Sequence, residues 1–361
     1  MSFVFAKAPQ RIYWELTRAC DLACRHCRAE AIPHRNPNEL TREEGFRLLD
    51  QLAEFGPPPP HLILTGGDPL KRPDFLALVE RAVGLGFPVS VAPSATALLT
   101  RERIHAMKEA GAGTMSLSLD GSNAERHDGL RGVTGTFDRT LEAARDILDA
   151  GIMLQINSLV TSETVTDLSD IYRLVASLGA QRWSLFFLIS VGRGRLLGQL
   201  SPTECEAMLR WAYEHSRGGK TIVTTTEAPH YRRVALQRMK AEGRSGEALL
   251  RNHPLRRGFG IRDGNGIMFI SHTGEIHPSG FLPLVAGDVR SQSPVEVYRE
   301  AKLFQSLRQP DRFNGPCGRC EFRAICGGSR ARAYAASCDP LGSDPLCAYE
   351  PGAPAPEENF V

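Results

Sequence analysis

Three cysteines near the start of the chain are spaced so that they can bind an iron–sulfur cluster. Cys20, Cys24 and Cys27 lie in the run Thr-Arg-Ala-Cys-Asp-Leu-Ala-Cys-Arg-His-Cys. A cubic cluster with four thiolate ligands passes electrons, whereas three thiolates leave one iron free for a bidentate small molecule. The alternative is a structural zinc site completed by His26 or His34, although zinc sites of that kind usually pair two short cysteine knuckles.

A glycine turn follows the second expected strand. Residues 62–69 read Leu-Ile-Leu-Thr-Gly-Gly-Asp-Pro, a hydrophobic strand that opens into Gly66 and Gly67. Because glycine lets a ligand approach the backbone closely, the turn suits the amino and carboxylate groups of a small molecule. The cysteine loop follows the strand-like segment 11–16, so both motifs are expected at the carboxyl ends of strands, where parallel sheets carry their chemistry.

Together these motifs resemble the radical S-adenosylmethionine (SAM) superfamily. The matching residues are Cys-x3-Cys-x2-Cys, with His26 before the third cysteine, and Gly66-Gly67-Asp68 where the family usually has Gly-Gly-Glu. The resemblance implies a [4Fe-4S] cluster that chelates SAM and cleaves it reductively. The 5′-deoxyadenosyl radical then abstracts a hydrogen atom from the substrate. Gly66, Gly67 and Asp68 are the first expected SAM contacts, with Asp for Glu a mild departure from the family.

Further polar residues are expected to bind SAM. Alternation along the strand 114–119 places Ser116, Ser118 and Asp120 on one face, where they could reach a ribose or the methionine carboxylate. The alternative for this segment is a plain strand end, because Asp-Gly favours a turn by itself.

Three more contacts are weaker expectations. Arg131 could bind an anionic substrate or the SAM carboxylate, or form a surface salt bridge. The resemblance also implies that Ser94 and Asn157 contact SAM.

A second cysteine group lies near the end of the chain. Cys317, Cys320, Cys326 and Cys347 supply four thiolates, which close a cluster and leave no iron free. A zinc ribbon is the alternative for such spacings. The passage resembles the auxiliary-cluster extension of radical SAM maturases, called SPASM in its seven-cysteine form and twitch in its shorter form, which implies a second [4Fe-4S] cluster.

Two positions argue against a third cluster. In the longer extension, a Gly-x4-Cys element and a later cysteine help to bind another cluster. Here the spacing from Gly274 arrives at Ser279, and the later position is Arg330. We therefore expect two [4Fe-4S] clusters in all.

The C-terminal sequence is similar to one branch of the superfamily, on the segments 277–283, 326–334 and 342–347. That branch contains enzymes that modify tetrapyrrole propionates in haem-type synthesis, and mycofactocin-type peptide maturases. The resemblance implies a carboxylate-bearing substrate, either tetrapyrrole-like or a peptide, and an external electron donor such as flavodoxin or ferredoxin. The general acid or base stays unassigned; the candidates are Tyr334, His272 and His277.

Four arginines near the second cysteine group could bind a substrate carboxylate, because guanidinium groups bind carboxylates bidentately. They are Arg319, Arg323, Arg330 and Arg332. The alternative is a solvated basic face that balances the charge of the cluster.

Two cysteines remain outside both groups. Cys205 shares a helix face with Met208, Leu209 and Ala212, which predicts core packing. Cys338 is either a turn residue near the cluster or a thiol exposed to substrate, and its role stays open.

Composition indicates a soluble enzyme. The chain has 361 residues, 42% hydrophobic and 23% charged, with a formal charge of +2, which favours no nucleic-acid partner. No apolar run approaches the length of a membrane span, and the N-terminal run lacks the long apolar region of a signal peptide. We expect a cytoplasmic protein whose clustered cysteines bind metal.

The elements that must position these residues form an α/β pattern. Strand-like segments at 11–16, 61–65, 87–92, 114–119, 152–160 and 183–189 alternate with helical patterns at 42–55, 74–85, 101–110, 136–150, 166–178 and 202–216. Six such units suggest an incomplete barrel, which resembles the superfamily's partial (β/α)6 TIM barrel. The expected organisation is a barrel at 1–217, a helical bridge at 218–260, a small α+β auxiliary-cluster domain of the twitch or SPASM type at 261–350, and a flexible tail at 351–361.

Overall fold

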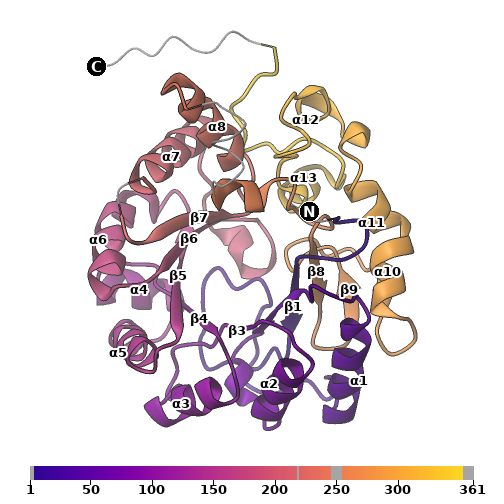
Figure 1. The fold of residues 1–361 in the computed structure, drawn as a ribbon. Helices are drawn as coiled ribbons and strands as arrows, with labels where there is room; N and C mark the ends of the chain where they lie inside the picture. The colour runs from indigo at the N-terminus through magenta and orange to yellow at the C-terminus, as the bar shows by residue number, and fades with distance from the viewer. Residues whose placement is uncertain (1–3, 218, 245–253, 353–361) are drawn as a thin grey trace.

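The computed structural model describes residues 4–217, 219–244 and 254–352. Ten strands form one sheet in the order β10-β9-β8-β1-β2-β3-β4-β5-β6-β7. The pairings from β8 to β7 are parallel, and those that join β9 to β8 and to β10 are antiparallel. In Figure 1 the parallel strands stand around a common centre with helices outside them. This arrangement confirms the predicted α/β partial barrel.

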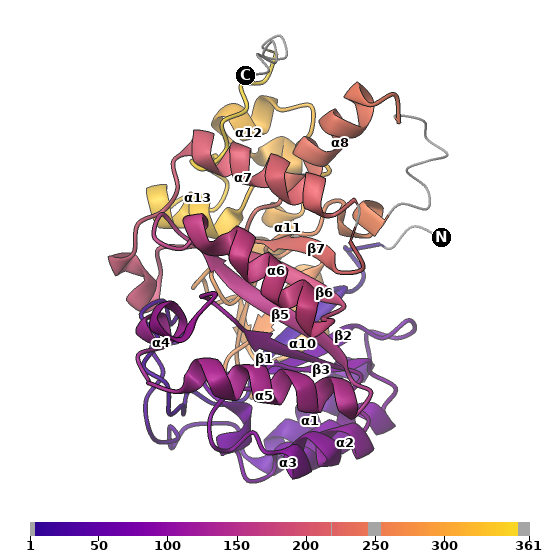
Figure 2. The same cartoon turned by 90° about the vertical axis from the view of Figure 1, so that its left-hand side faces the viewer.

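The predicted strand–helix units are all present. The strands are β1 (Arg11–Glu15), β2 (His61–Thr65), β3 (Val89–Val91), β4 (Thr114–Ser118), β5 (Met153–Val160) and β6 (Arg182–Phe187). The helices are α1 (Arg42–Ala53), α2 (Phe75–Gly84), α3 (Arg101–Glu109), α5 (Thr136–Asp149), α6 (Leu168–Leu178) and α7 (Pro202–His215). Figure 2 shows α5 and α6 lying across the outer side of the strands.

Two elements of the barrel were not predicted. Helix α4 (Ala124–Arg131) begins at Asn123, whose side chain accepts a hydrogen bond from the Arg126 amide, and ends at Gly132 in the left-handed conformation. Strand β7 (Ile222–Thr226) lies in the segment expected to be a helical bridge, and it extends the sheet beyond β6. Its five consecutive β-branched residues, Ile222 to Thr226, favour a strand over a helix.

The remainder of the bridge is helical where it is described. Helix α8 (Tyr231–Ala241) follows β7, within the segment expected to be a helical bridge. Residues 245–253 lie outside the described residues, as does the part of the expected tail at 353–361. The domain boundaries at 217 and 260 stay predictions.

Alternation along the strands separates a helix-covered face from an inner face. Leu62, Leu64, Leu154 and Ile156 belong to the main hydrophobic core, which also contains Ile147 of α5 and other apolar residues of the surrounding helices. The residues between them on each strand therefore point away from the helices, toward the inside of the barrel. That inner face and the loops at the carboxyl ends of the strands carry the site residues described below.

The C-terminal segment continues the sheet beside β1. It contains β8 (Ile267–Ile270), β9 (Glu275–His277), β10 (Gly287–Asp288), α10 (Pro294–Glu300), α11 (Lys302–Leu307), α12 (Gly315–Arg319) and α13 (Arg330–Ser337). Short 3-10 helices occur at Pro69–Lys71 (η1), Val165–Asp167 (η2), Gly192–Leu196 (η3), Pro254–Gly258 (η4) and Pro310–Arg312 (η5). Figure 1 shows the helices of this segment, coloured orange to yellow, beside its strands β8 and β9.

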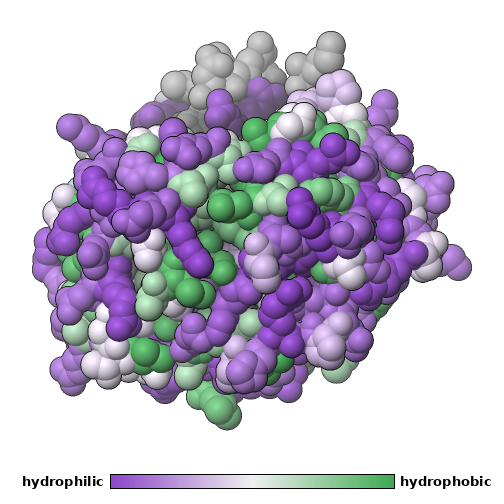
Figure 3. Space-filling view, turned by 90° about the horizontal axis from the view of Figure 1, so that it is seen from below, coloured by the Kyte–Doolittle hydropathy of each residue, from purple (hydrophilic) through white to green (hydrophobic). Residues whose placement is uncertain are grey.

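The surface is mostly polar on the face shown in Figure 3. In Figure 3, hydrophilic residues predominate and separate the hydrophobic spots. Among the described residues, no helix is both long and apolar enough to cross a membrane.

Candidate active site

The three N-terminal cysteines converge in the loop that follows β1. Cys20 and Cys24 are buried and pack in one small cluster with the partly buried Cys27. Hydrogen-bond donors face each sulfur: the Leu22 amide lies 3.4 Å from Cys20 Sγ, and the Ala31 amide lies 3.4 Å from Cys27 Sγ.

The same thiols receive side-chain contacts from outside the loop. Ser94 Oγ lies 3.5 Å from Cys20 Sγ, and Arg131 Nη1 lies 3.6 Å from Cys24 Sγ. Hydrogen bonds to sulfur are what stabilises the thiolate ligands of an iron–sulfur cluster. The loop therefore suits a cluster held by three cysteines.

The two glycines after β2 pack against the cysteine loop itself. The Gly67 amide donates a hydrogen bond of 2.7 Å to the Thr17 carbonyl, and the Asp68 amide donates one of 2.7 Å to the Ala19 carbonyl. A Cβ atom at Gly66 would overlap the Thr17 carbonyl oxygen, and one at Gly67 would overlap that of Ala19. The structure thus gives these glycines a packing requirement that the sequence did not reveal.

Asp68 lies beneath this turn with its side chain fully buried. Its carboxylate accepts hydrogen bonds of 3.1 Å from the Leu70 amide and 2.8 Å from Thr96 Oγ1. Burial raises the pKa of Asp68. Ser94 Oγ donates a hydrogen bond of 2.9 Å to the Gly67 carbonyl, so Ser94 connects the glycine turn with Cys20.

Asp120 and Arg131 form a buried ion pair beside the cysteine loop. Asp120 also accepts hydrogen bonds from the Leu159 amide, at 2.6 Å. Burial alone would raise the pKa of Asp120, but the charge of Arg131 lowers it. Likewise, burial alone would lower the pKa of Arg131, but the charge of Asp120 raises it. Because Arg131 also contacts Cys24, the pair joins the end of β4 to the cysteine loop.

Ser116, Ser118 and Asn157 lie on the inner face of the barrel. Ser118 is the register partner of Asn157 on the neighbouring strand, so the two side chains are adjacent. All three are partly exposed, while Met115 and Leu117, which alternate with the two serines along β4, are fully buried on the other face. The alternation predicted for the two serines is confirmed, whereas Asp120, expected on the same face, lies beyond the end of β4 and is buried in its ion pair with Arg131.

Residues after β6 also support the cysteine loop, and sequence reasoning missed them. Arg193 Nε donates a hydrogen bond of 2.9 Å to the Cys24 carbonyl, and its amide donates one of 3.1 Å to the Cys27 carbonyl. Gly192 has a φ of +52°, and a Cβ atom there would lie 2.5 Å from the Arg28 carbonyl oxygen. The run Gly-Arg-Gly-Arg at 192–195 marks the segment, but nothing in it indicates which loop it contacts.

The four C-terminal cysteines also come together. Burial raises the pKa of Cys326 to about 12 and that of Cys347 to about 11, and it raises the pKa of Cys320. The nearby Cys317 contributes to all three shifts in the same direction. With pKa values this high, Cys326 and Cys347 stay protonated near pH 7 as long as no metal binds them. A bound metal would stabilise their thiolate form.

Arginines and backbone amides surround this second group. Arg330 Nη2 lies 3.7 Å from Cys317 Sγ, and Arg233 Nη2 of α8 lies 3.9 Å from Cys347 Sγ. The Asp344 amide lies 3.5 Å from Cys317 Sγ. The donors match the needs of a thiolate-ligated cluster, and Arg233 is one that sequence reasoning missed.

The predicted carboxylate-binding arginine surface is wrong for Arg330 and Arg332, because both are fully buried. Arg330 donates to backbone carbonyls, including a 2.5 Å bond to Gly342, and stacks over the Phe313 ring. Arg332 forms an ion pair with Asp344 and donates a hydrogen bond of 2.8 Å to the Glu227 carbonyl. Internal partners therefore occupy the groups that were expected to bind substrate.

The other two arginines lie closer to the surface. Arg323 pairs with Asp311, and Arg319 is exposed.

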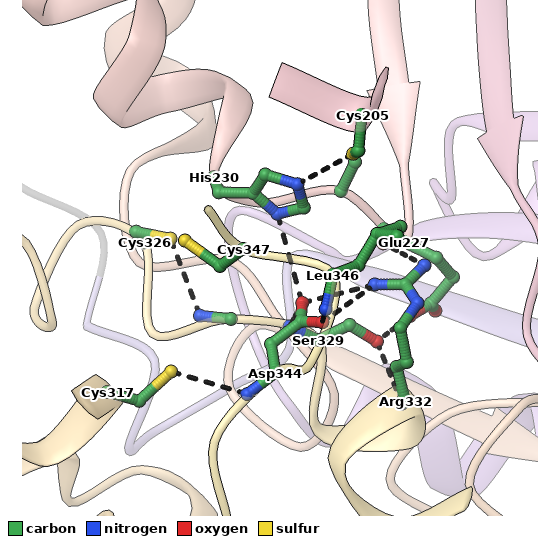
Figure 4. A network of polar contacts seen from close by, with 12 residues as sticks. Cys205, Glu227, His230, Cys317, Cys326, Ser329, Arg332, Asp344, Leu346 and Cys347 are labelled. Atoms are coloured by element: carbon green, nitrogen blue, oxygen red, sulfur yellow. Dashed lines mark hydrogen bonds and ion pairs between the residues drawn. The ribbon is translucent and has the colours of Figure 1, made fainter. Parts of the chain in front are cut away.

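A buried polar network links α7 and α8 to the C-terminal cysteines (Figure 4). Cys205 Sγ lies 3.2 Å from His230 Nε2, and His230 Nδ1 lies 3.8 Å from an Asp344 carboxylate oxygen. Burial lowers the pKa of His230 to about 4, so the ring is neutral near pH 7. The prediction of core packing for Cys205 is confirmed.

The three candidate acid–base residues, His272, His277 and Tyr334, have different neighbours. His272 Nδ1 lies 2.8 Å from Glu15, and its Nε2 lies 3.2 Å from Asn36 Nδ2. His277 lies 3.6 Å from Glu275, and Tyr334 packs in a small hydrophobic cluster with Leu282. Arg28 links the surroundings of the two histidines, because it pairs with Glu15 beside His272 and lies over the Phe269 ring that His277 contacts.

Glu15 at the end of β1 is held as a carboxylate. Although burial opposes the shift, Arg28 and His272 lower its pKa to about 2.

Cys338, the remaining open residue, is exposed and ends α13 with a φ of +59°. Within the described ranges, no three His, Cys, Asp or Glu side chains are placed to hold a single metal ion.

Comparison with known proteins assigns the chain to a family. Residues 14–175 match the model of the radical SAM superfamily. The chain is 38% identical over 346 residues to an AdoMet-dependent heme synthase of Methanosarcina barkeri, which covers 96% of this chain and 98% of that protein. It is also 38% identical to an AdoMet-dependent heme synthase of Oleidesulfovibrio alaskensis, over 94% of this chain and 87% of that protein.

More distant relatives share the fold. A PqqA peptide cyclase of Rhodopseudomonas palustris is 29% identical over 95% of this chain and 88% of that protein. The crystal structure of Streptococcus suis SuiB bound to S-adenosylmethionine superposes with a TM-score of 0.73 at 17% identity, covering 95% of this chain and 78% of that chain. The chain belongs to the radical SAM superfamily, in the same family as the AdoMet-dependent heme synthases.

Proposed function

We propose that this radical SAM enzyme modifies carboxylate-bearing side chains of a tetrapyrrole in haem-type synthesis. The observation that carries the proposal is the 38% identity to AdoMet-dependent heme synthases across nearly the whole length of both chains. A peptide maturase is the second candidate, because a PqqA peptide cyclase aligns over a similar share of the chain. Its lower identity, 29%, places it behind the tetrapyrrole enzyme.

The N-terminal site is proposed to hold the reactive cofactors. Cys20, Cys24 and Cys27 would ligate a [4Fe-4S] cluster, which would supply the electron for the reductive cleavage of SAM and so the radical that abstracts hydrogen. The inner-face and turn residues would bind SAM around it. They are Gly66, Gly67, Asp68, Ser94, Ser116, Ser118, Asp120, Arg131 and Asn157.

The contacts described above divide this set by role. Asp68 and Asp120 use their carboxylates within the protein, so they position the glycine turn and the cysteine loop. Ser116, Ser118 and Asn157 keep exposed surface on the inner face and can contact a ligand directly.

The C-terminal site is proposed to hold one auxiliary [4Fe-4S] cluster on Cys317, Cys320, Cys326 and Cys347. Arg330 supports a single cluster, because the residue at the position of a further cysteine is already buried and donates to Cys317. Converting a propionate to a vinyl group releases carbon dioxide and one electron after hydrogen abstraction, and a closed cluster can accept that electron. Flavodoxin or ferredoxin would supply the electron that reduces the N-terminal cluster.

Anaerobic turnover tests the proposal. The reconstituted enzyme, with SAM and dithionite, should convert iron coproporphyrin III to a product that has lost carbon dioxide and two hydrogens from a side chain. Mass spectrometry should find one 5′-deoxyadenosine for each side chain changed. A porphyrin that stays unchanged while SAM is cleaved would contradict the tetrapyrrole assignment and favour a peptide substrate.

A further inference from the structure

Two arginines lie at the amino ends of opposite strands, on the inner face of the barrel. Arg11 begins β1 and Arg182 begins β6. Their neighbours Ile12 and Trp183 are fully buried in the helix-covered core, so the arginines point to the other side of the sheet. In register, Arg11 lies beside His61, and Arg182 lies beside Gln155.

Neither arginine is neutralised by the protein. Across residues 4–217, 219–244 and 254–352, no carboxylate forms an ion pair with Arg11 or Arg182. Arg182 Nη1 makes a long contact of 3.4 Å to Gln155 Oε1, while its buried Nε has no hydrogen-bond partner. Such a group is costly to bury unless a partner arrives.

The two charges are close enough to act on each other. Burial and then the charge of Arg11 lower the pKa of Arg182. Burial, followed by the charges of Arg11 and Arg182, lowers the pKa of His61 to about 4. His61 is therefore neutral near pH 7 and adds no positive charge beside the two arginines.

Exposed apolar side chains lie beside this charge. Ile222 is the register partner of Arg182 and is 48% exposed, and Met153, on the same face of β5 as Gln155, is 45% exposed. Parallel strands are normally covered on both faces. An apolar surface next to two unpaired arginines matches a ligand that combines an apolar ring with carboxylates.

We propose that Arg11 and Arg182 bind carboxylates of the substrate side chains that are not being changed, while Met153 and Ile222 contact its apolar ring. The inference rests on the proposed function and adds a binding site to it. Guanidinium groups bind carboxylates through paired hydrogen bonds, which fixes orientation as well as affinity. The strand β1 rises roughly 13 Å from Arg11 to Glu15, so a ligand held at this end can extend toward the carboxyl ends where SAM is expected.

Porphyrin binding to the reconstituted enzyme tests the site. Iron coproporphyrin III would be titrated by its absorbance against wild type, Arg11→Gln, Arg182→Gln and the double variant. Each single variant should weaken binding about 10-fold or more, because hydrogen bonds to charged groups contribute more than neutral ones. Arg182→Lys should retain part of the affinity, since it keeps the charge but not the fork. Arg173→Gln, on the exposed side of α6, is the matched control and should bind like wild type.

The possible results separate this inference from the proposed function. Wild-type affinity in a folded double variant, with normal circular dichroism and iron content, would overturn the arginine site while the function stands. A wild-type enzyme that does not bind the porphyrin at all would overturn the proposed function, and this site with it. Weaker binding that follows the loss of charge, with Arg173→Gln unaffected, would support the site.

Discussion

The two cysteine groups differ in more than their number of ligands. The N-terminal group receives donors from its own loop, at Leu22 and Ala31, and from barrel residues such as Arg131. The C-terminal group receives Arg330 from α13, which lies within its own segment, and Arg233 from α8, which lies 114 residues away from Cys347 in the sequence. The first group is thus a loop held by a barrel, whereas the second joins two parts of the chain. Loss of metal should therefore have different consequences at the two sites.

Loss of one N-terminal ligand should have the largest effect. Replacing Cys24 with Ala should abolish reductive cleavage of SAM, because a cluster with two remaining ligands cannot present its open iron correctly. Formation of 5′-deoxyadenosine under dithionite measures this, with the absorbance of the C-terminal cluster retained. The matched control is Cys338→Ala, which removes an exposed thiol and should leave cleavage unchanged. Cleavage that persists in the Cys24 variant would mean that the N-terminal assignment is wrong.

Loss of two C-terminal ligands should separate the roles of the groups. Replacing Cys320 and Cys326 together with Ala should stop substrate turnover but leave abortive 5′-deoxyadenosine measurable, because a four-thiolate cluster has no free iron for SAM. Metal binding and folding are coupled, so circular dichroism must accompany the assay. Cys205→Ala, which removes a buried thiol of the adjacent network, tests whether any thiol loss has the same effect. A folded double variant with wild-type turnover would make the second cluster a structural element only.

The grouping of Cys20 with Cys24 and Cys27 could be predicted from the sequence, because their spacing is local. The strand–helix order and the alternation of Ser116 and Ser118 with buried residues were equally readable. Strand β7 was missed although its β-branched run was visible, and α4 was missed because few of its residues are buried. These errors left the partial barrel intact.

The surroundings of the ligands could not be predicted. Arg193 and Arg233 contact the cysteine groups across 169 and 114 residues of sequence. Only the tertiary fold decides such pairings. Arg330 shows the same limit. Its charge predicted a substrate-binding surface, but the side chain is buried and contacts Cys317 instead.

Disturbing the close packing around the N-terminal cysteines should lower the free energy of unfolding. Replacing Gly67 with Ala places a Cβ atom against the Ala19 carbonyl oxygen, so the cysteine loop must shift. We expect roughly 1–3 kcal/mol of destabilisation, the usual cost of overpacking. Urea unfolding measures it. Gly84→Ala is the control, because no atom lies within 4 Å of a Cβ there. Equal unfolding midpoints for the two variants would contradict the packing role.

Removing a positive charge beside the C-terminal cysteines should have the smallest effect, a shift in the reduction potential of the cluster. Replacing Arg330 with Gln removes a positive charge 3.7 Å from Cys317 Sγ, which favours the oxidised cluster and lowers its potential. A screened interaction of about 1 kcal/mol corresponds to roughly 40 mV for one electron. An EPR-monitored titration would measure it in a background where Cys20, Cys24 and Cys27 are Ala, so that only the C-terminal cluster contributes. Arg330→Lys should recover most of the potential because it keeps the charge, and the exposed Arg319→Gln should not change it. A potential that is equal in the Gln and Lys variants would show that Arg330 holds the fold without tuning the cluster.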